Sequence, residues 1–207
     1  GWIGYVPPIE ELENPNLKFA TEIISDDGKM LGTWSISKEN RVFVGYDQLS
    51  PNLIHALIAT EDERFSEHSG IDARAFIRAL VKRGILMQKN AGGGSTITQQ
   101  LAKNLFPRDT VRNRGRLVRN AKLVTSKLKE WITALKLEYN YTKEEIVAMY
   151  LNTVFYGSNA YGIKAAAKTF FDKEPSELNV QEAALLVGVV NAPTRYSPVR
   201  NPERALA

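Results

Sequence analysis

A cluster of titratable side chains stands where an apolar segment stops, in the stretch ATEDERFSEHSG at residues 59–70. The apolar residues of 53–58 recur at the spacing of one helix face, so the stretch begins at the end of a helix. Glu61 is the first carboxylate there, and a carboxylate held beside a substrate hydroxyl can serve as a general base. Glycosyl chemistry uses such an acid when a second acid faces it. The segment therefore predicts acid–base chemistry at Glu61.

His68, in the same stretch, is a candidate metal ligand. The chain has no cysteine and only one other histidine, His55, which does not stand at ligand spacing. A zinc site is therefore not expected. We interpret His68 as a structural residue that bonds within its own loop.

A glycine-rich loop and a helix start form a second candidate site, GGGSTITQQLAKN at residues 92–104. Glycines let a backbone approach a ligand closely, and Thr96 with Gln99 has the form of a capping box. Gln99, Gln100 and Lys103 fall within one helical turn and are expected to share a face. A loop, a helix N-terminus and a lysine suit phosphate and sugar hydroxyls. A flexible loop before a solvated helix face is the alternative that the pattern leaves open.

A third candidate is SKLKEWITALKLEYN at residues 126–140. Lys127 and Glu130 stand three residues apart, a spacing typical of a surface ion pair. The expected core face of this helix is formed by four apolar residues: Leu128, Ile132, Leu135 and Tyr139.

Between these segments lies a strongly basic stretch at residues 107–122 with a single acid, Asp109. Its density of positive charge favours an anionic surface, either lipid headgroups or nucleic acid. No aromatic side chain is interleaved to stack on bases, which disfavours nucleic acid. A solvated segment is the remaining interpretation. The cations are Arg108, Arg112, Arg114, Arg116, Arg119 and Lys122.

The composition and the positions of glycine and proline residues predict a mainly α chain around these motifs. The 207 residues are 43% hydrophobic, enough for a core, and the net charge of +4 leaves several anionic partners open. No segment approaches the roughly 18 apolar residues of a membrane span. Short strands are predicted at 18–24 and 29–36 around a turn. Helices are predicted from Pro51, after a Ser50 N-cap, and at 72–88, 96–105, 116–138, 143–152, 160–171 and 179–190. Both ends suggest an excised domain.

Five segments occur in an order that resembles the motif blocks of the peptidoglycan glycosyltransferases, family 51. The segments are EDERFSEHSG (61–70), GGSTITQQLAKN (93–104), KLKEWITALKLE (127–138), IVAMYLNTVFYGSNAYGIKAAAKTFF (146–171) and NAPTRYSP (191–198). The resemblance covers roughly residues 50–205, and the ordered set is far more specific than any one block.

The resemblance implies a fold, a reaction and a location. The fold is mainly α, the lysozyme-like two-lobed glycosyltransferase fold, with a short β-rich segment at its N-terminus. Residues 1–48 would be a linker and hairpin and 49–207 the glycosyltransferase domain, like that of a bifunctional class A penicillin-binding protein with its membrane anchor and transpeptidase domain absent. The reaction is polymerisation of lipid II on the extracytoplasmic face of the bacterial cytoplasmic membrane. The implied partners are lipid II, the nascent glycan chain, the membrane surface and other cell-wall synthesis proteins, but no nucleic acid.

The resemblance also implies residue roles. Glu61 is the catalytic base, and Glu130 the second acid, which organises the diphosphate directly or through a divalent cation. Lys103 and Lys127 hold the diphosphate charge. No cofactor is required, although Mg²⁺ or Mn²⁺ at Glu130 is compatible with this pattern. The remaining substrate-binding residues are Ser95, Thr96, Gln99, Gln100, Asn104 and Arg195.

One departure from the family pattern lies in the third block, where Ser126 stands at the usual arginine position. A cation of the site is then absent or supplied by Arg119 or Lys122. Two other interpretations remain beside the glycosyltransferase. One is a lytic transglycosylase or muramidase on the same architecture, whose sugar leaving group needs no lysines. The other is an inactive membrane-surface scaffold.

Overall fold

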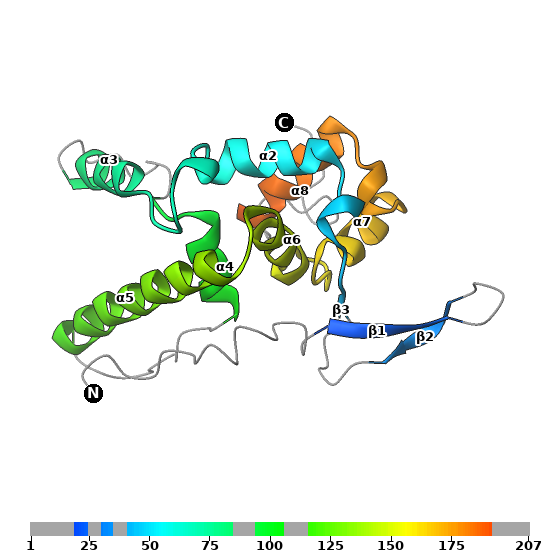
Figure 1. The fold of residues 1–207 in the computed structure, drawn as a ribbon, viewed down its shortest axis with the longest axis horizontal. Helices are drawn as coiled ribbons and strands as arrows, with labels where there is room; N and C mark the ends of the chain where they lie inside the picture. Colours follow the sequence, from blue (N-terminus) through cyan, green and yellow to red (C-terminus); the bar gives the residue numbers. More distant parts are fainter. Residues whose placement is uncertain (1–18, 25–29, 35–40, 85–93, 106–115, 192–207) are drawn as a thin grey trace. The chain divides into compact units, whose positions relative to one another are not determined.

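The computed structural model describes residues 19–24, 30–34, 41–84, 94–105 and 116–191 (Figure 1). Most of these residues are helical, which confirms the prediction of a mainly α chain. Every helical segment predicted after residue 70 contains a helix, and the described ends differ from the predicted ends by up to four residues. Among the described residues, no helix is both long and apolar enough to cross a membrane.

The elements follow one another along the chain as three strands and then the helices. The strands are β1 (Phe19–Ile24), β2 (Met30–Trp34) and β3 (Arg41–Val42). The α-helices are α2 (Pro51–Glu61), α3 (Ala73–Gly84), α4 (Ile97–Leu105), α5 (Arg116–Asn140), α6 (Lys143–Thr153), α7 (Ile163–Phe171) and α8 (Val180–Asn191). Short 3₁₀ turns lie at Tyr46–Gln48, Phe65–Glu67 and Pro175–Glu177.

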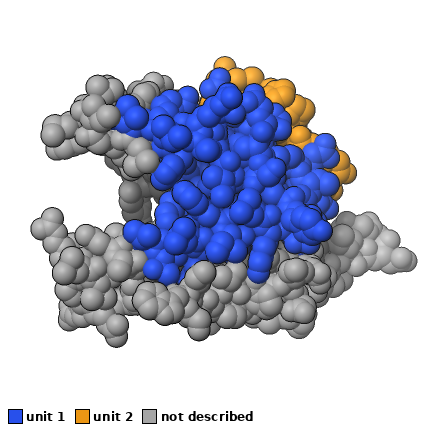
Figure 2. All heavy atoms as spheres, turned by 60° about the vertical axis from the view of Figure 1, so that its left-hand side comes forward, with its two compact units in different colours: residues 1–13, 61–146 blue, residues 14–60, 147–207 orange. Residues whose placement is uncertain are grey.

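The chain divides into two compact units. Unit 1 comprises residues 1–13 and 61–146, and unit 2 comprises residues 14–60 and 147–207 (Figure 2). The divisions fall at the last residue of α2 and inside α6. Unit 2 is therefore discontinuous in sequence, because the main segment of unit 1 is inserted into it.

Unit 1 is built around the packing of α4 against α5. The fully buried Leu101 belongs to α4, and the fully buried Ala134 and Leu137 belong to α5. The small Ala134 and neighbouring Thr133 suit close helix packing, since they let two backbones approach each other.

The core face predicted for residues 126–140 is wrong. Leu128 and Leu135 are 47% and 46% exposed, and Tyr139 is 89% exposed. The buried face of α5 instead carries Glu130, Thr133, Ala134 and Leu137, at the i, i+3, i+4, i+7 spacing of one helix stripe. Apolar residues recur on both stripes of α5, so periodicity alone did not reveal which one faces α4.

Unit 2 contains the sheet and the apolar helix that precedes Glu61. The sheet order is β2-β1-β3, with β1 antiparallel to β2 and parallel to β3. Ser50 precedes α2 as predicted, but its hydroxyl donates to the Leu178 carbonyl at 2.7 Å instead of accepting a helix N–H. Leu53 and Leu57 of α2 are buried, in agreement with the predicted helix face.

Asn152, near the end of α6, holds the segment after β3. Its side-chain oxygen accepts the Val44 N–H at 2.8 Å, and its amide donates to the Val44 carbonyl, also at 2.8 Å. The amide thus satisfies both backbone groups of Val44 as a neighbouring strand would. The helix predicted from residue 160 begins only at Ile163, because Gly162 takes φ 81° and a Cβ there would meet the Asn152 carbonyl oxygen at 2.7 Å.

Candidate functional site

Glu61 and Gln100 meet within unit 1. Glu61 is the last residue of α2, and Gln100 lies in the first turns of α4. The Gln100 amide donates to Glu61 Oε2 at 2.8 Å, and both side chains are part-buried. The first and second motif blocks are therefore joined by a hydrogen bond to the carboxylate predicted to act as a base. A carboxylate oxygen that accepts an amide N–H in this way is held in a defined orientation.

The residue after Glu61 anchors the start of α4. Asp62 Oδ2 accepts the backbone N–H of Ile97 at 3.0 Å, so a carboxylate satisfies a donor at the helix N-terminus. His68 Nε2 lies 2.9 and 3.0 Å from the two Asp62 oxygens. The Gly70 N–H donates to His68 Nδ1 at 3.2 Å, which places the imidazole proton on Nε2. These contacts confirm His68 as a structural residue of its own loop.

Thr96 and Gln99 form only half of the predicted capping box. Thr96 Oγ1 accepts the Gln99 N–H at 3.1 Å and donates to the Gly70 carbonyl at 2.7 Å. The reciprocal half is wrong, because Gln99 Oε1 is buried and has no hydrogen-bond partner among the described residues. The predicted shared face is wrong too, since Gln99 is 2% exposed whereas Lys103 is exposed.

Ser95, Lys127 and Glu130 form a second cluster in unit 1. Lys127 Nζ donates to Ser95 Oγ and to Glu130 Oε2, at 2.9 Å in each case. The Lys127 side chain is 37% exposed, but the Glu130 side chain is only 6% exposed. The interpretation of this pair as an ordinary surface ion pair is therefore wrong. A buried carboxylate needs its ammonium partner, and the ammonium still reaches solvent, where it can meet an anion.

Other predicted residues lie apart from these two clusters or outside the described residues. Lys103 and Asn104 are exposed on the last turn of α4. Arg195 lies outside the described residues, as do Arg108, Arg112 and Arg114. The backbone of Arg116, Arg119 and Lys122 is helical within α5, but their side chains are not described, so the compensation proposed for Ser126 stays a prediction.

A salt bridge fixes the turn between Asp62 and α3. The Arg64 guanidinium contacts Asp72 Oδ1 at 3.2 Å, and the same oxygen accepts the Ala75 N–H at 3.0 Å, which caps α3. Burial opposes ionisation of Asp72, but the Ala75 N–H and the Arg64 charge outweigh it and hold the pKa of Asp72 below its ordinary value. The loop that follows Glu61 is therefore anchored at both ends.

The residues around Glu130 do not form a divalent-cation site by themselves. Among the described residues, no three histidine, aspartate or glutamate side chains gather as metal ligands would. Glu130 is a single carboxylate with a lysine ammonium already 2.9 Å from one oxygen. A Mg²⁺ or Mn²⁺ ion there would take most of its ligands from substrate oxygens.

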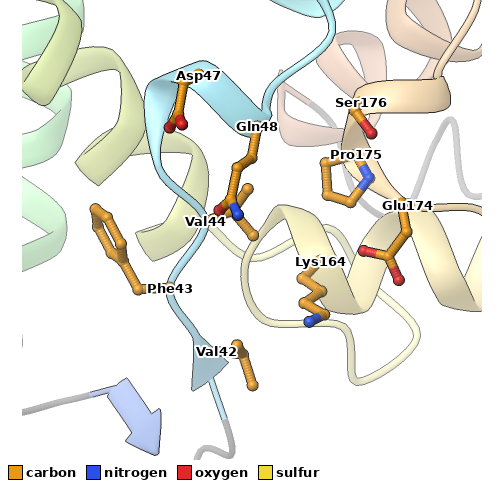
Figure 3. Close-up of a pocket in the computed structure, with 9 residues that line it drawn as sticks. All are labelled: Val42, Phe43, Val44, Asp47, Gln48, Lys164, Glu174, Pro175 and Ser176. Atoms are coloured by element: carbon orange, nitrogen blue, oxygen red, sulfur yellow. The ribbon is translucent and has the colours of Figure 1, made fainter. Parts of the chain in front are cut away.

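Unit 2 contains a pocket of about 510 Å³ that none of the predicted site residues lines. Figure 3 shows the segment around Val42 and Val44 on one side and Lys164, Glu174 and Pro175 on the other. Two carboxylates, Asp47 and Glu174, and the Lys164 ammonium line this pocket, but none of the residues predicted to act on the substrate does, so we take unit 1 as the location of the candidate site.

A comparison with protein families decides the assignment. The family described as transglycosylase matches residues 27–207. The chain belongs to the transglycosylase family. Residues of both clusters lie within the matched range, and the family resemblance inferred from the five motif blocks is confirmed.

The relatives of this chain include penicillin-binding proteins. Penicillin-binding protein 1A of Aquifex aeolicus is 39% identical over 210 residues, which cover 97% of the chain and 27% of that protein. Penicillin-binding protein 1F of Bacillus subtilis is 39% identical over 188 residues, 91% of the chain and 24% of that protein. Penicillin-binding protein 1A of Escherichia coli is 34% identical over 202 residues, 98% of the chain and 22% of that protein. The chain thus spans about a quarter of the length of these relatives.

Sequence reasoning missed two charged residues that contact α4 and the loop after Glu61, namely Glu138 and Lys143. Glu138 is the last residue of the third block, and its side chain is 6% exposed. Lys143 opens α6 and lies five residues further on, a spacing at which side chains of one helix do not face each other. The signal available in the sequence was an acid at the end of one predicted helix and a base at the start of the next.

Proposed function

We propose that this transglycosylase polymerises lipid II into glycan strands by inverting glycosyl transfer. The observation that carries the proposal is the 2.8 Å hydrogen bond from Gln100 to Glu61, which joins the first two motif blocks at the predicted base. The family assignment supports the same reaction. We further propose the two-lobed, lysozyme-like fold of the family, which the mainly α content and the division into two units support.

The proposed step transfers one proton and exchanges one bond. Glu61 takes the proton of the 4-hydroxyl on the acceptor GlcNAc, and this oxygen then forms a bond to the anomeric carbon of the donor. The bond from that carbon to the diphosphate oxygen breaks, and undecaprenyl diphosphate leaves with the electron pair. Gln100 keeps the Glu61 carboxylate oriented, so the base loses little freedom when the hydroxyl arrives.

The diphosphate leaving group would be bound by Lys127, Lys103 and Glu130. Negative charge develops on the diphosphate as the sugar leaves, and fixed cations stabilise that charge in the transition state. Lys127 is set in place by Ser95 and Glu130 and keeps an exposed surface. A divalent cation held jointly by Glu130 and the diphosphate would add positive charge beside that of the two lysines. Addition of EDTA with and without Mg²⁺ tests that contribution.

We propose that unit 1 contacts the bacterial cytoplasmic membrane at its extracytoplasmic face, where the lipid tail of the substrate resides. Exposed apolar side chains on two helices of this unit support the proposal, since isolated soluble domains seldom show such stripes. On α3 they are Ile77 (60% exposed) and Val81 (42%), and on α5 Val124 (62%), Leu128, Leu135 and Tyr139. Contacts with other cell-wall synthesis proteins remain a prediction.

Replacement of Glu61 by glutamine tests the proposed function. The variant Glu61→Gln keeps an oxygen that can accept the Gln100 amide, so the fold and the binding of moenomycin, which resembles the donor, should be retained. Polymerisation of lipid II should fall by roughly 100- to 10,000-fold, the usual contribution of a general base. Glu63→Gln is the matched control, because Glu63 is exposed in the same loop.

Three results would contradict the proposal. A Glu61→Gln variant that keeps more than about a tenth of the wild-type rate would exclude Glu61 as the base. Fragments released from finished peptidoglycan, with no polymer formed from lipid II, would instead indicate a lytic enzyme, and neither product would indicate a scaffold.

A further inference from the structure

Glu138 connects α4 to the start of α6. Its Oε1 accepts a hydrogen bond from Thr98 Oγ1 at 2.6 Å and another from Lys143 Nζ at 2.9 Å, while Oε2 lies 2.8 Å from the same ammonium. Thr98 is fully buried and the Glu138 side chain is 6% exposed. A carboxylate buried to this degree is stable only with such partners, so the three side chains form a unit.

Lys143 extends this unit to the loop that follows Glu61. Its ammonium also donates to the His68 carbonyl at 2.6 Å, and it lies 4.3 Å from the centroid of the Phe65 ring. The ammonium is thus shared between a carboxylate of α5, a carbonyl of the loop and an aromatic face. One lysine therefore ties the loop to two helices.

The contacts close into a ring. From His68 the path runs to Asp62, from Asp62 to the Ile97 N–H at the start of α4, and from α4 through Thr98 to Glu138 and Lys143, which returns to the His68 carbonyl. Asp62 is the neighbour of Glu61, and α4 carries Gln100. The ring therefore includes the residue next to Glu61 and the helix that carries Gln100, the two partners of the 2.8 Å hydrogen bond at the predicted base.

The close approach of Gly70 to the backbone of α5 supports the arrangement of the ring. Gly70 takes φ +88°, and a Cβ at this position would lie 3.0 Å from the Ala134 carbonyl oxygen and 3.1 Å from Glu138 Cγ. The loop thus lies directly against α5, with no room for a side chain between them. The path through Glu138 is short because this glycine permits it.

We propose that Glu138 and Lys143 are positioning residues of the transferase site, which act by holding α4 and the 62–70 loop so that Gln100 meets Glu61. This inference rests on the proposed function of Glu61. Neither residue touches the reacting atoms in this scheme. Their loss should lower kcat while leaving the binding of the donor at Lys103 and Lys127 almost unchanged, because misplacement of a base by about 1 Å can cost on the order of 100-fold.

Two variants break the ring without leaving a buried charge alone. Thr98→Val removes one hydroxyl and keeps the shape of a fully buried side chain. Glu138→Gln combined with Lys143→Met removes both charges together, which avoids an unpaired buried carboxylate. The matched control is the double variant Lys173→Met, Glu182→Gln in unit 2. It breaks a salt bridge outside the ring, in which Lys173 Nζ lies 2.7 Å from Glu182 Oε1.

The first measurement is turnover of lipid II together with moenomycin affinity. We expect kcat to fall about 3- to 10-fold in Thr98→Val and about 10- to 100-fold in the double variant. KM and the moenomycin Kd should stay within about twofold, and the control pair should leave kcat unchanged. Lys143→Arg alone, which keeps a cation and several donors beside Glu138, should retain more of the wild-type kcat than the Glu138→Gln, Lys143→Met variant.

A double-mutant cycle separates positioning from a general loss of stability. If the ring acts through Gln100, then Thr98→Val should change kcat by less than about twofold in a Gln100→Leu background, because the contact it protects is already gone. Effects of the two substitutions that simply multiply would overturn the proposal. So would a normal kcat in the Glu138→Gln, Lys143→Met variant.

Hydrogen exchange supplies a readout that does not depend on catalysis. The Ile97 and Gly70 amides, which donate to Asp62 and to His68, should exchange at least about tenfold faster in both ring variants than in wild type. Unchanged exchange would show that the contacts are not coupled and would overturn the ring itself. A wild-type chain that forms no polymer would overturn the proposed function and the positioning role together, even if the exchange rates confirm the ring.

Discussion

Replacement of Lys127 by methionine would show whether its ion pair with Glu130 is an ordinary exposed pair or a pair that stabilises a buried carboxylate. The substitution keeps the length of the side chain and removes the ammonium that lies 2.9 Å from Glu130 Oε2. Glu130, with a side chain only 6% exposed, would then lose this cation, and Ser95 Oγ would lose a donor at 2.9 Å.

The loss of unfolding free energy expected for Lys127→Met follows from the unequal burial of the Lys127 and Glu130 side chains. Breaking a fully buried pair costs about 3–5 kcal/mol, whereas an exposed pair contributes about 0–1 kcal/mol. Because Lys127 is 37% exposed, solvent screens part of the interaction, and we expect about 1–3 kcal/mol. For a chain of about this length each kcal/mol lowers Tm by about 2–4 °C, so a loss of 2 kcal/mol should lower it by about 4–8 °C.

Urea unfolding at pH 7 measures this cost directly. Lys127→Met should be less stable than the double variant Lys127→Met, Glu130→Gln, because the double variant leaves no buried charge. Lys129→Met is the matched control on the same helix and should change stability by less than about 0.5 kcal/mol. If Lys127→Met proves as stable as Lys129→Met, the pair is the surface pair that its spacing suggests, and the reasoning from burial is refuted.

Three further predictions concern the charge, the backbone and the pH response of unit 1. Lys103→Ala and Lys127→Ala should each weaken moenomycin binding, and unchanged affinity in both would place the diphosphate elsewhere. Gly70→Ala should destabilise the chain by about 1–3 kcal/mol or more, since φ is +88° and α5 leaves no room for a Cβ. Gly188→Ala, where no atom lies within 4 Å of the added Cβ, should instead stabilise the chain by about 0.5–1 kcal/mol. Equal urea midpoints for the two variants would contradict both expectations. The pKa of Asp72 is lowered on folding, so its contribution is present at neutral pH and is lost as the pH falls through the lowered value. Asp72→Asn should therefore be destabilising at pH 7 and lose its effect in strong acid, and a pH-independent difference between the two unfolding curves would contradict this.

The sequence predicted local features of the fold well. Helices begin at Pro51 and Ile97, next to the predicted N-cap residues Ser50 and Thr96, although only the Thr96 hydroxyl accepts a helix N–H. Such signals act within a few residues and are readable from one chain. The buried face of α5 could not be predicted from such local signals, because the apolar Leu128 and Leu135 are exposed whereas Glu130 is buried.

The candidate site was predictable in its residues but not in its contacts. Glu61 and Gln100 are 39 residues apart, and their hydrogen bond depends on how α4 is anchored by Asp62. The pairing of Thr98 with Glu138 spans 40 residues and gives no periodic signal. Motif blocks indicate which residues gather, whereas tertiary packing decides which atoms meet. The orphaned Gln99 carbonyl has no explanation in the described contacts.

The split of unit 2 along the chain has a consequence for biosynthesis. The bonds between Val44 and Asn152 join residues 108 positions apart, so they cannot form until the ribosome has made everything between them. At about 5–20 residues per second, this delay is on the order of ten seconds. Until residues 175–178 are also made, Ser50 at the start of α2 lacks the Pro175 and Leu178 carbonyls that accept its backbone N–H and its hydroxyl. The apolar face of α2, which carries Leu53 and Leu57, is therefore synthesised well before its unit is complete, and transiently exposed apolar surface of this kind is what chaperones bind.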